Sequence, residues 1–149
     1  MVLPDFTTTG SPEFISNSCG VIAGLYLGTE RGEILKGLIE SMTFYLRECL
    51  VSLPEGLDIT DFRAAGGGSK SDTWLQISTD ILGHPFLRPK VNEAGALGTA
   101  ILAGFGSSIF PSISAGVDLM VKSRKTFYPD PTIQQLYNEH FEKYHLYGL

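Results

Sequence analysis

Residues 62–83 constrain the fold most, because three consecutive glycines separate a short apolar run from a helix-periodic run. The apolar run predicts a strand that begins at Phe62, and the spacing of Trp74 and Ile81 predicts a helix that Gly83 closes. Glycines have no Cβ, so such a turn lets the backbone come close to a ligand. The helix start that follows suits a phosphate group, because its N–H groups are unpaired.

The glycines alone do not identify a ligand. A P-loop requires glycine directly before its lysine, but Ser69 precedes Lys70, and the dinucleotide fingerprint requires a third glycine where Ser71 stands. Ser69 and Asp72 have the spacing of a loose capping box. Glycine turns between a strand and a helix also serve plain packing. A ligand role and a packing role are therefore both open.

Composition limits the class of protein. The chain has 149 residues, which predicts one domain with a real core, and its net charge of −5 without a Lys/Arg cluster excludes a nucleic-acid partner. The apolar runs are too short for a membrane span, and the start does not resemble a signal peptide. Cys19 and Cys49 lie far apart, so we expect two reduced thiols and a cytoplasmic protein.

The opening residues read as the end of a strand, so we expect a piece of a longer protein.

The first half of the chain predicts a strand and a long helix. Residues 19–27 alternate in a way that predicts a strand covered on both faces. Residues 30–52 carry a wide helical stripe of apolar side chains. Thr29 is the expected N-cap of this helix, and Glu40 and Arg47 are expected on its solvated face.

The second half predicts more helices and short extended segments. Asn92 is expected to cap a helix over residues 93–103, in which Gly95 and Gly98 favour close packing over a ligand contact. A last helix is expected after Asp130, which precedes a proline. The order of elements indicates an α/β fold with a partly parallel sheet. Ligands of such sheets bind beyond the carboxyl ends of strands, where the glycine turn lies.

Six segments, taken in order, resemble the FGGY family of carbohydrate kinases, which includes xylulose, gluconate and glycerol kinases. The segments are residues 2–12, 19–25, the Glu40-Ser41 pair, 65–71, 80–83 and 93–100. Residues 65–71 are similar to the family pattern G-G-G-x-x-S, and residues 93–100 to E-x-x-A-x-G-A-A. The chain departs from the family at Thr8, where glycine is common, and at Cys19, where arginine is common.

The resemblance implies an α/β domain of the actin-like ATPase (RNase H-like) type, with a mixed sheet flanked by helices and truncated at its N-terminal strands. Residues 1–149 then form the C-terminal, nucleotide-holding domain of a two-domain sugar kinase. The resemblance implies ATP and ADP as ligands, with Mg²⁺ bound through the ATP phosphates. The positions carried over to the nucleotide are Gly66, Gly67, Gly68 and Ser71, with Asp72 as an adjacent polar candidate.

The family's catalytic aspartate and most of its sugar contacts lie in the N-terminal domain. We therefore expect no catalytic residue here, and no phosphorylation of a sugar or polyol by this chain alone. The alternatives are a non-catalytic nucleotide-binding or oligomerisation module, and an unrelated α/β domain whose glycines serve packing. An unpaired edge on the strand at residues 19–27 predicts either self-association into a homo-oligomer or a disordered start of the chain.

Overall fold

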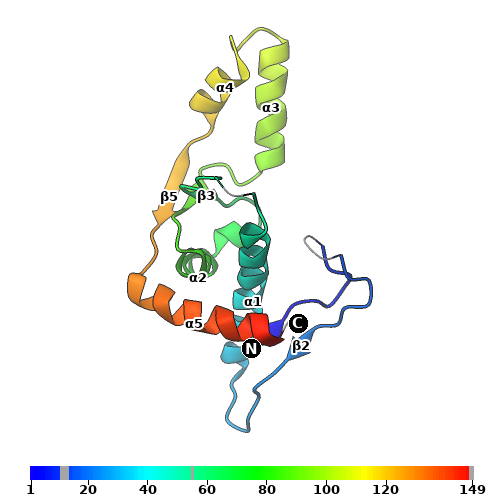
Figure 1. Ribbon diagram of the computed structural model, residues 1–149. Helices are drawn as coiled ribbons and strands as arrows, with labels where there is room; N and C mark the ends of the chain where they lie inside the picture. The colour runs from blue at the N-terminus through cyan, green and yellow to red at the C-terminus, as the bar shows by residue number, and fades with distance from the viewer. Residues whose placement is uncertain (11–13, 55, 148–149) are drawn as a thin grey trace. The chain divides into compact units, whose positions relative to one another are not determined.

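The computed structural model describes residues 1–10, 14–54 and 56–147 (Figure 1). The elements are β1 (Val2–Leu3), β2 (Val21–Ile22), α1 (Arg31–Val51), β3 (Phe62–Arg63), a 3₁₀ turn (Gly68–Lys70), α2 (Asp72–Leu82), β4 (Phe86–Pro89), α3 (Ala94–Gly106), α4 (Ile113–Met120), β5 (Ser123–Phe127) and α5 (Pro131–Tyr147). Two compact units share these elements. Unit 1 comprises Met1–Asp58, Ile77–Gly83 and Pro129–Leu149, and unit 2 comprises Ile59–Gln76 and His84–Tyr128.

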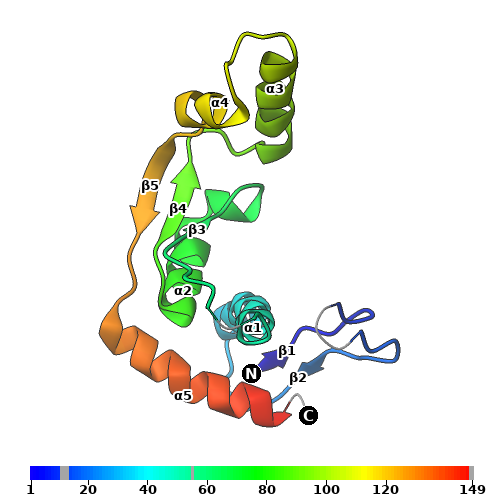
Figure 2. The same cartoon turned by 45° about the horizontal axis from the view of Figure 1, so that its top comes forward.

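Unit 2 contains a three-stranded mixed sheet in the order β3-β4-β5 (Figure 2). Phe86 of β4 pairs with Phe62 of the parallel strand β3 and with Phe127 of the antiparallel strand β5. The β4–β5 register shifts between Arg88 and Pro89, where proline cannot donate to the ladder. The predicted partly parallel sheet is therefore confirmed.

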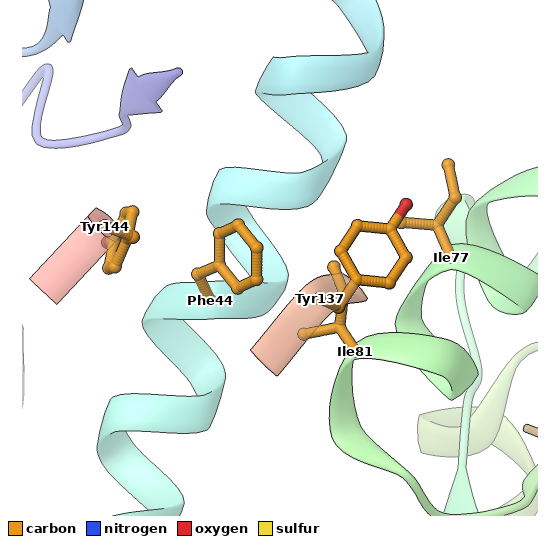
Figure 3. Close-up of a cluster of buried hydrophobic side chains, with 5 residues drawn as sticks. All are labelled: Phe44, Ile77, Ile81, Tyr137 and Tyr144. Atoms are coloured by element: carbon orange, nitrogen blue, oxygen red, sulfur yellow. The ribbon is translucent and has the colours of Figure 1, made fainter. Parts of the chain in front are cut away.

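Unit 1 is held together by an aromatic core between α1, the end of α2 and α5 (Figure 3). The ring of Phe44 lies 6.2 Å from that of Tyr137 in an edge-on arrangement and 5.3 Å from that of Tyr144. Ile77 and Ile81 complete the cluster, and all five side chains are buried. Aromatic pairs of this kind add about 0.5–1.5 kcal/mol each beyond the apolar area that they bury.

The predicted cap of α1 was wrong by one residue. Glu30 is the N-cap and forms a capping box with Glu33, whose carboxylate accepts a 2.8 Å hydrogen bond from the Glu30 backbone N–H. The Thr29 hydroxyl instead accepts from the backbone N–H of Tyr26 at 3.0 Å. Two acidic residues in this position also complement the positive end of the helix dipole.

The predicted solvated face of α1 was wrong at Glu40 and Arg47, whereas Lys36, on the same predicted face, is 57% exposed. Glu40 is largely covered and accepts a hydrogen bond of 2.8 Å from the hydroxyl of Tyr137. The guanidinium group of Arg47 lies 4.2 Å from the ring centre of Phe141 and donates a hydrogen bond of 2.9 Å to Asn138 Oδ1. All three partners are on α5, so the charges of Glu40 and Arg47 belong to the interface between these two helices.

The strand expected at residues 19–27 is short and exposed. Only Val21 and Ile22 are extended into a ladder, and they pair with β1 in an antiparallel two-stranded sheet. Leu25 is 56% exposed and Leu27 is fully exposed, so the expected cover on both faces is absent from the described residues. The alternation of apolar residues did not reveal this, because it is the same whether or not a second layer covers the strand.

The start of α3 also differs from expectation. Its N-cap is Glu93, without a side-chain hydrogen bond, so Asn92 is not the cap. A Cβ added at Gly95 or Gly98 would have no neighbour within 4 Å, so packing inside the described chain does not require these glycines. Close packing occurs instead at Gly104, where an added Cβ would meet a neighbouring ring.

No helix in the described parts of the chain is both long and apolar enough to cross a membrane.

Candidate functional site

The glycine turn lies at the carboxyl end of β3 in unit 2, as the sequence predicts. The backbone N–H of Ala64 donates to Leu87 O at 3.1 Å and still follows the parallel ladder. The N–H of Gly66 donates to Asn92 O at 3.0 Å, and Gly66 has a φ of +86°. A side chain at this φ is strained, so the turn itself requires glycine here.

Hydrogen bonds within the turn fix its shape. The buried hydroxyl of Ser69 donates to Gly66 O at 2.7 Å, and the N–H of Lys70 donates to Gly67 O at 3.1 Å. The 3₁₀ turn that results leads directly into α2. The backbone is therefore held in place before any ligand arrives.

The space beside the turn differs between its three glycines. A Cβ added at Gly66 or Gly67 would have no neighbour within 4 Å, whereas one at Gly68 would lie 3.3 Å from the ring of Trp74. Gly67 has a helical φ of −61°, which any residue adopts. Neither backbone strain nor packing within the described chain therefore requires glycine at position 67.

Ser71 is the N-cap of α2. Its hydroxyl oxygen accepts a hydrogen bond of 3.2 Å from the backbone N–H of Trp74. The capping box predicted between Ser69 and Asp72 therefore does not form. A hydroxyl group has one hydrogen to donate and two lone pairs to accept with. This contact uses one lone pair, so the Ser71 hydroxyl hydrogen is available at the start of the helix.

Asp72 links the start of α2 to both neighbouring strands. Its carboxylate lies 2.7 Å from Arg88 Nη2 on β4 and 2.5 Å from Lys125 Nζ on β5. The hydrogen bond from Lys125 and the contact with Arg88 lower the pKa of Asp72. Because each carboxylate oxygen already has a basic partner, Asp72 is suited to hold the turn in position.

Two buried polar groups beside the turn were not predicted from the sequence. Arg88 Nε and Asn92 Oδ1 are buried without a hydrogen-bond partner in the described structure. Arg88 Nη2 also has no hydrogen-bond partner, because its short contact with Asp72 does not have the angles of a hydrogen bond. That contact is therefore an ion pair. Buried polar atoms usually find a partner, so these mark a region that a polar group or water can complete. The only signal in the sequence was a charged residue inside the short strand 86–89.

Comparison with known proteins identifies the family. The "FGGY family of carbohydrate kinases, C-terminal domain" matches residues 1–107 of the chain. This chain belongs to the FGGY family of carbohydrate kinases. The resemblance drawn from the six sequence segments is confirmed.

Curated relatives of this FGGY chain are glycerol kinases. That of Xanthomonas axonopodis pv. citri (strain 306) is 34% identical over 113 residues, which is 74% of this chain and 23% of the relative. That of Deinococcus radiodurans is 33% identical over 114 residues, 75% of this chain and 23% of the relative. The chain thus spans about a quarter of the length of these relatives.

Solved FGGY structures share the fold. Plasmodium falciparum glycerol kinase with ADP matches with a TM-score of 0.81 and 27% identity, over 99% of this chain and 31% of that one. Ligand-bound xylulose kinase from Lactobacillus acidophilus matches with a TM-score of 0.86 and 23% identity, over 97% and 29%. The expected fold class, an α/β domain of the actin-like ATPase type with a mixed sheet flanked by helices, is confirmed.

Five FGGY positions carried over from the sequence lie together in unit 2. Gly66, Gly67, Gly68, Ser71 and Asp72 form one continuous turn and helix start. The described residues contain no group of three His, Cys, Asp or Glu side chains arranged to hold a metal ion. The basic residues beside Asp72 are Arg88 and Lys125.

Proposed function

We propose that this chain is the nucleotide-holding, C-terminal domain of an ATP-dependent carbohydrate kinase. The whole enzyme transfers the γ-phosphate of ATP to a hydroxyl group of a sugar or polyol. Gly67 carries this proposal, because nothing in the described chain excludes a side chain there. A ligand that lies against the turn is a physical reason for glycine at this position.

The residues present fit a nucleotide. The backbone of Gly66, Gly67 and Gly68 would lie against it, and the Ser71 hydroxyl can donate to it. Asp72 is proposed as a positioning residue, since both of its oxygens are engaged. When bound, ATP supplies the transferable phosphoryl group, and Mg²⁺ on its phosphates offsets their charge.

Phosphoryl transfer also needs a base and a bound acceptor, and we propose that both lie outside this chain. The family resemblance puts the catalytic aspartate and the sugar contacts in an N-terminal domain, and this chain spans 23% of the glycerol kinase relatives. The chain alone is therefore expected to bind nucleotide without transferring phosphate. A coupled ADP-release assay with glycerol, xylulose and gluconate tests this, with the Xanthomonas relative as positive control. Turnover by the chain well above background contradicts it.

Nucleotide binding can be measured through Trp74, which is the only tryptophan of the chain and lies against Gly68. We expect its fluorescence to change on titration with ADP. Gly67→Leu should weaken binding by about tenfold or more, because an inserted side chain of this size costs roughly 1–3 kcal/mol. Gly32→Leu is the matched control, since Gly32 also has an open Cβ position and lies in unit 1.

Equal ADP affinities of the Gly67 and Gly32 variants would remove the nucleotide proposal. That result would favour the unrelated domain whose glycines serve packing. ADP binding by the chain, without turnover by any longer protein that contains it, would favour the non-catalytic nucleotide-binding module.

A further inference from the structure

Unit 1 contains a cavity of about 270 Å³ between the start of the chain, the end of α1 and the end of α5. Leu3 and Asp5 line it from the start of the chain, Glu48 from α1, and Tyr144 and His145 from α5. All residues that line it belong to unit 1, whereas the glycine turn belongs to unit 2. The cavity therefore shares no lining residue with the proposed nucleotide site.

Its lining is acidic. Asp5, Glu48 and Glu142 contribute three carboxylates, and none of the described residues that line it is a lysine or arginine. The one group able to carry a positive charge is His145, whose Nδ1 lies 3.3 Å from Glu48 Oε1. That side chain is more than half exposed. The carboxylates thus outnumber the cations in the wall of the cavity.

The guanidinium group of Arg47, which interacts with the charge of the cavity residue Glu142, is held by residues of α5. Arg47 donates 2.9 Å to Asn138 Oδ1 and lies 4.2 Å from the ring of Phe141. Burial lowers the pKa of Arg47, and the neighbouring charge of Glu142 acts in the opposite direction. Arg47 therefore partly offsets Glu142, and no described arginine forms an ion pair with Asp5 or Glu48.

One hydroxyl group in the cavity wall, that of Tyr144, has no hydrogen-bond partner among the described residues. Tyr144 is only 2% exposed, yet its hydroxyl makes no hydrogen bond within the described structure and is not among the fully enclosed atoms. Burial, and then the charges of Glu48 and Asp5, raise the pKa of Tyr144. The hydroxyl thus stays protonated and lies in a negative potential, where its oxygen can accept a hydrogen bond from a cation.

The remaining walls are mostly apolar, with the hydroxyl-bearing side chains of Thr9 and Ser52 among them. The rings of Tyr45, Phe141 and Tyr144 line the cavity together with aliphatic side chains. Aromatic faces attract ammonium groups and exclude water from the chain that carries them. The volume equals that of roughly nine liquid water molecules at about 30 Å³ each, which suits a ligand with about as many non-hydrogen atoms.

We propose that this cavity binds an aliphatic diammonium ion. Its methylene chain would pack against the aromatic rings. Its ammonium groups would donate to the carboxylates of Asp5, Glu48 and Glu142 and to the Tyr144 hydroxyl. Ammonium–carboxylate hydrogen bonds are charge-assisted and roughly twice as strong as neutral ones. An anionic ligand would meet uncompensated negative charge in the same space.

Calorimetric titration of the chain with 1,8-diaminooctane at neutral pH tests the proposal. The neutral 1,8-octanediol and the anionic octanedioate, of the same length, serve as comparisons. We expect the diamine to bind about tenfold more tightly than the diol, because only its groups are charged. Octanedioate should not bind. Added salt should weaken the diamine complex and leave any diol binding unchanged.

Two variants test the residues named. Glu48→Gln should weaken diamine binding about tenfold, and Tyr144→Phe about fivefold. The Tyr144 variant removes only a hydroxyl that makes no hydrogen bond to any described residue, so its melting temperature should equal that of the wild type. Glu139→Gln, a carboxylate of α5 away from the cavity, and Tyr128→Phe in unit 2 are the matched controls and should bind like the wild type.

Three results overturn the proposal: no detectable binding of the diamine, equal affinity for the diamine and the diol, or unchanged affinity in both cavity variants. Titration with ADP in parallel keeps this result apart from the nucleotide proposal, since neither cavity variant alters the glycine turn.

Discussion

Tyr137 donates its hydroxyl hydrogen to Glu40 over 2.8 Å, between residues 97 positions apart in the chain. Burial, followed by the hydrogen bond to Glu40, raises the pKa of Tyr137. Lys36 approaches the same carboxylate to 2.7 Å. A residue expected to face solvent thus joins α1 to α5.

The first prediction compares two buried tyrosines of α5. Tyr137→Phe should lower the free energy of unfolding by about 1.5–3 kcal/mol, because it removes a hydrogen bond to a charged acceptor. Tyr144→Phe should change it by less than about 0.5 kcal/mol, since that hydroxyl has no hydrogen-bond partner in the part of the chain that the structure describes. Urea unfolding of both variants measures the difference. Equal losses would mean that the Glu40 contact contributes nothing to stability.

The second prediction concerns the aromatic core of unit 1. Phe44→Ala should destabilise the chain by about 3–5 kcal/mol, because Phe44 is 4% exposed and touches three rings of α5. Met42→Ala, on the exposed side of the same helix, should stay within about 0.5 kcal/mol of the wild type. Thermal unfolding with circular dichroism distinguishes the two, and similar melting temperatures would contradict this description of the core.

The third prediction is that alanine substitutions at two adjacent glycines change the stability of the chain in opposite directions. Gly66→Ala should cost about 1–2 kcal/mol of stability, because Gly66 has a φ of +86°. Gly67→Ala should stabilise by about 0.4–1 kcal/mol, because its backbone is helical and the space beside it is open. Denaturant unfolding of the chain without nucleotide measures both, and a destabilised Gly67 variant would reveal a constraint within the chain itself.

The fourth prediction is a pH dependence. Lys125 and Arg88 lower the pKa of Asp72 in the folded state. As pH falls, Asp72 therefore takes up a proton in the unfolded chain before it does so in the folded chain. Its contribution to the free energy of unfolding is complete above about pH 4 and is lost below it. Stability curves of the wild type and Asp72→Asn should converge as pH drops through this range. The effect should be small, since the side chain is 57% exposed.

A constant difference between those two curves from neutral to acidic pH would show that the Asp72 charge does not contribute.

The fifth prediction concerns association. β2 pairs only with β1 in the described structure, and Val21 and Ile22 are each 42% exposed. Unpaired strand edges template pairing with another chain, so sedimentation should show a mass that rises with concentration. Val21→Lys should reduce the association, and Leu119→Lys, on an exposed face of α4, should not. Scattering from a compact monomer at every concentration would contradict self-association.

The sequence predicted those elements whose signals are local. The strand–turn–helix of residues 62–83 and the long helix α1 follow from periodicity and from glycine or proline at their ends, and both are present. Gly83 closes α2 with a φ of +69°, as its position predicted. Asp130 caps α5 by accepting from the N–H of Thr132 at 2.9 Å. Such features depend on a few neighbouring residues, so they can be deduced before the fold is known.

Features that depend on distant partners could not be deduced in this way. Nothing local shows that Lys125 meets Asp72 53 positions away, or that Glu40 meets Tyr137. The glycines of the candidate site were proposed from the sequence because three consecutive glycines are an unusual choice. Arg88 was missed because its role is set by the pairing of β4 with two other strands and by the start of α2.

Because the space beside Gly67 is open, selection for folding and selection for activity should favour different residues at this position. A library of variants screened only for folding should accept many residues at position 67, because nothing in the described chain opposes them. The same library screened for phosphoryl transfer in a complete enzyme should retain glycine. Such a contrast at one codon would distinguish the demands of the ligand from those of the polypeptide.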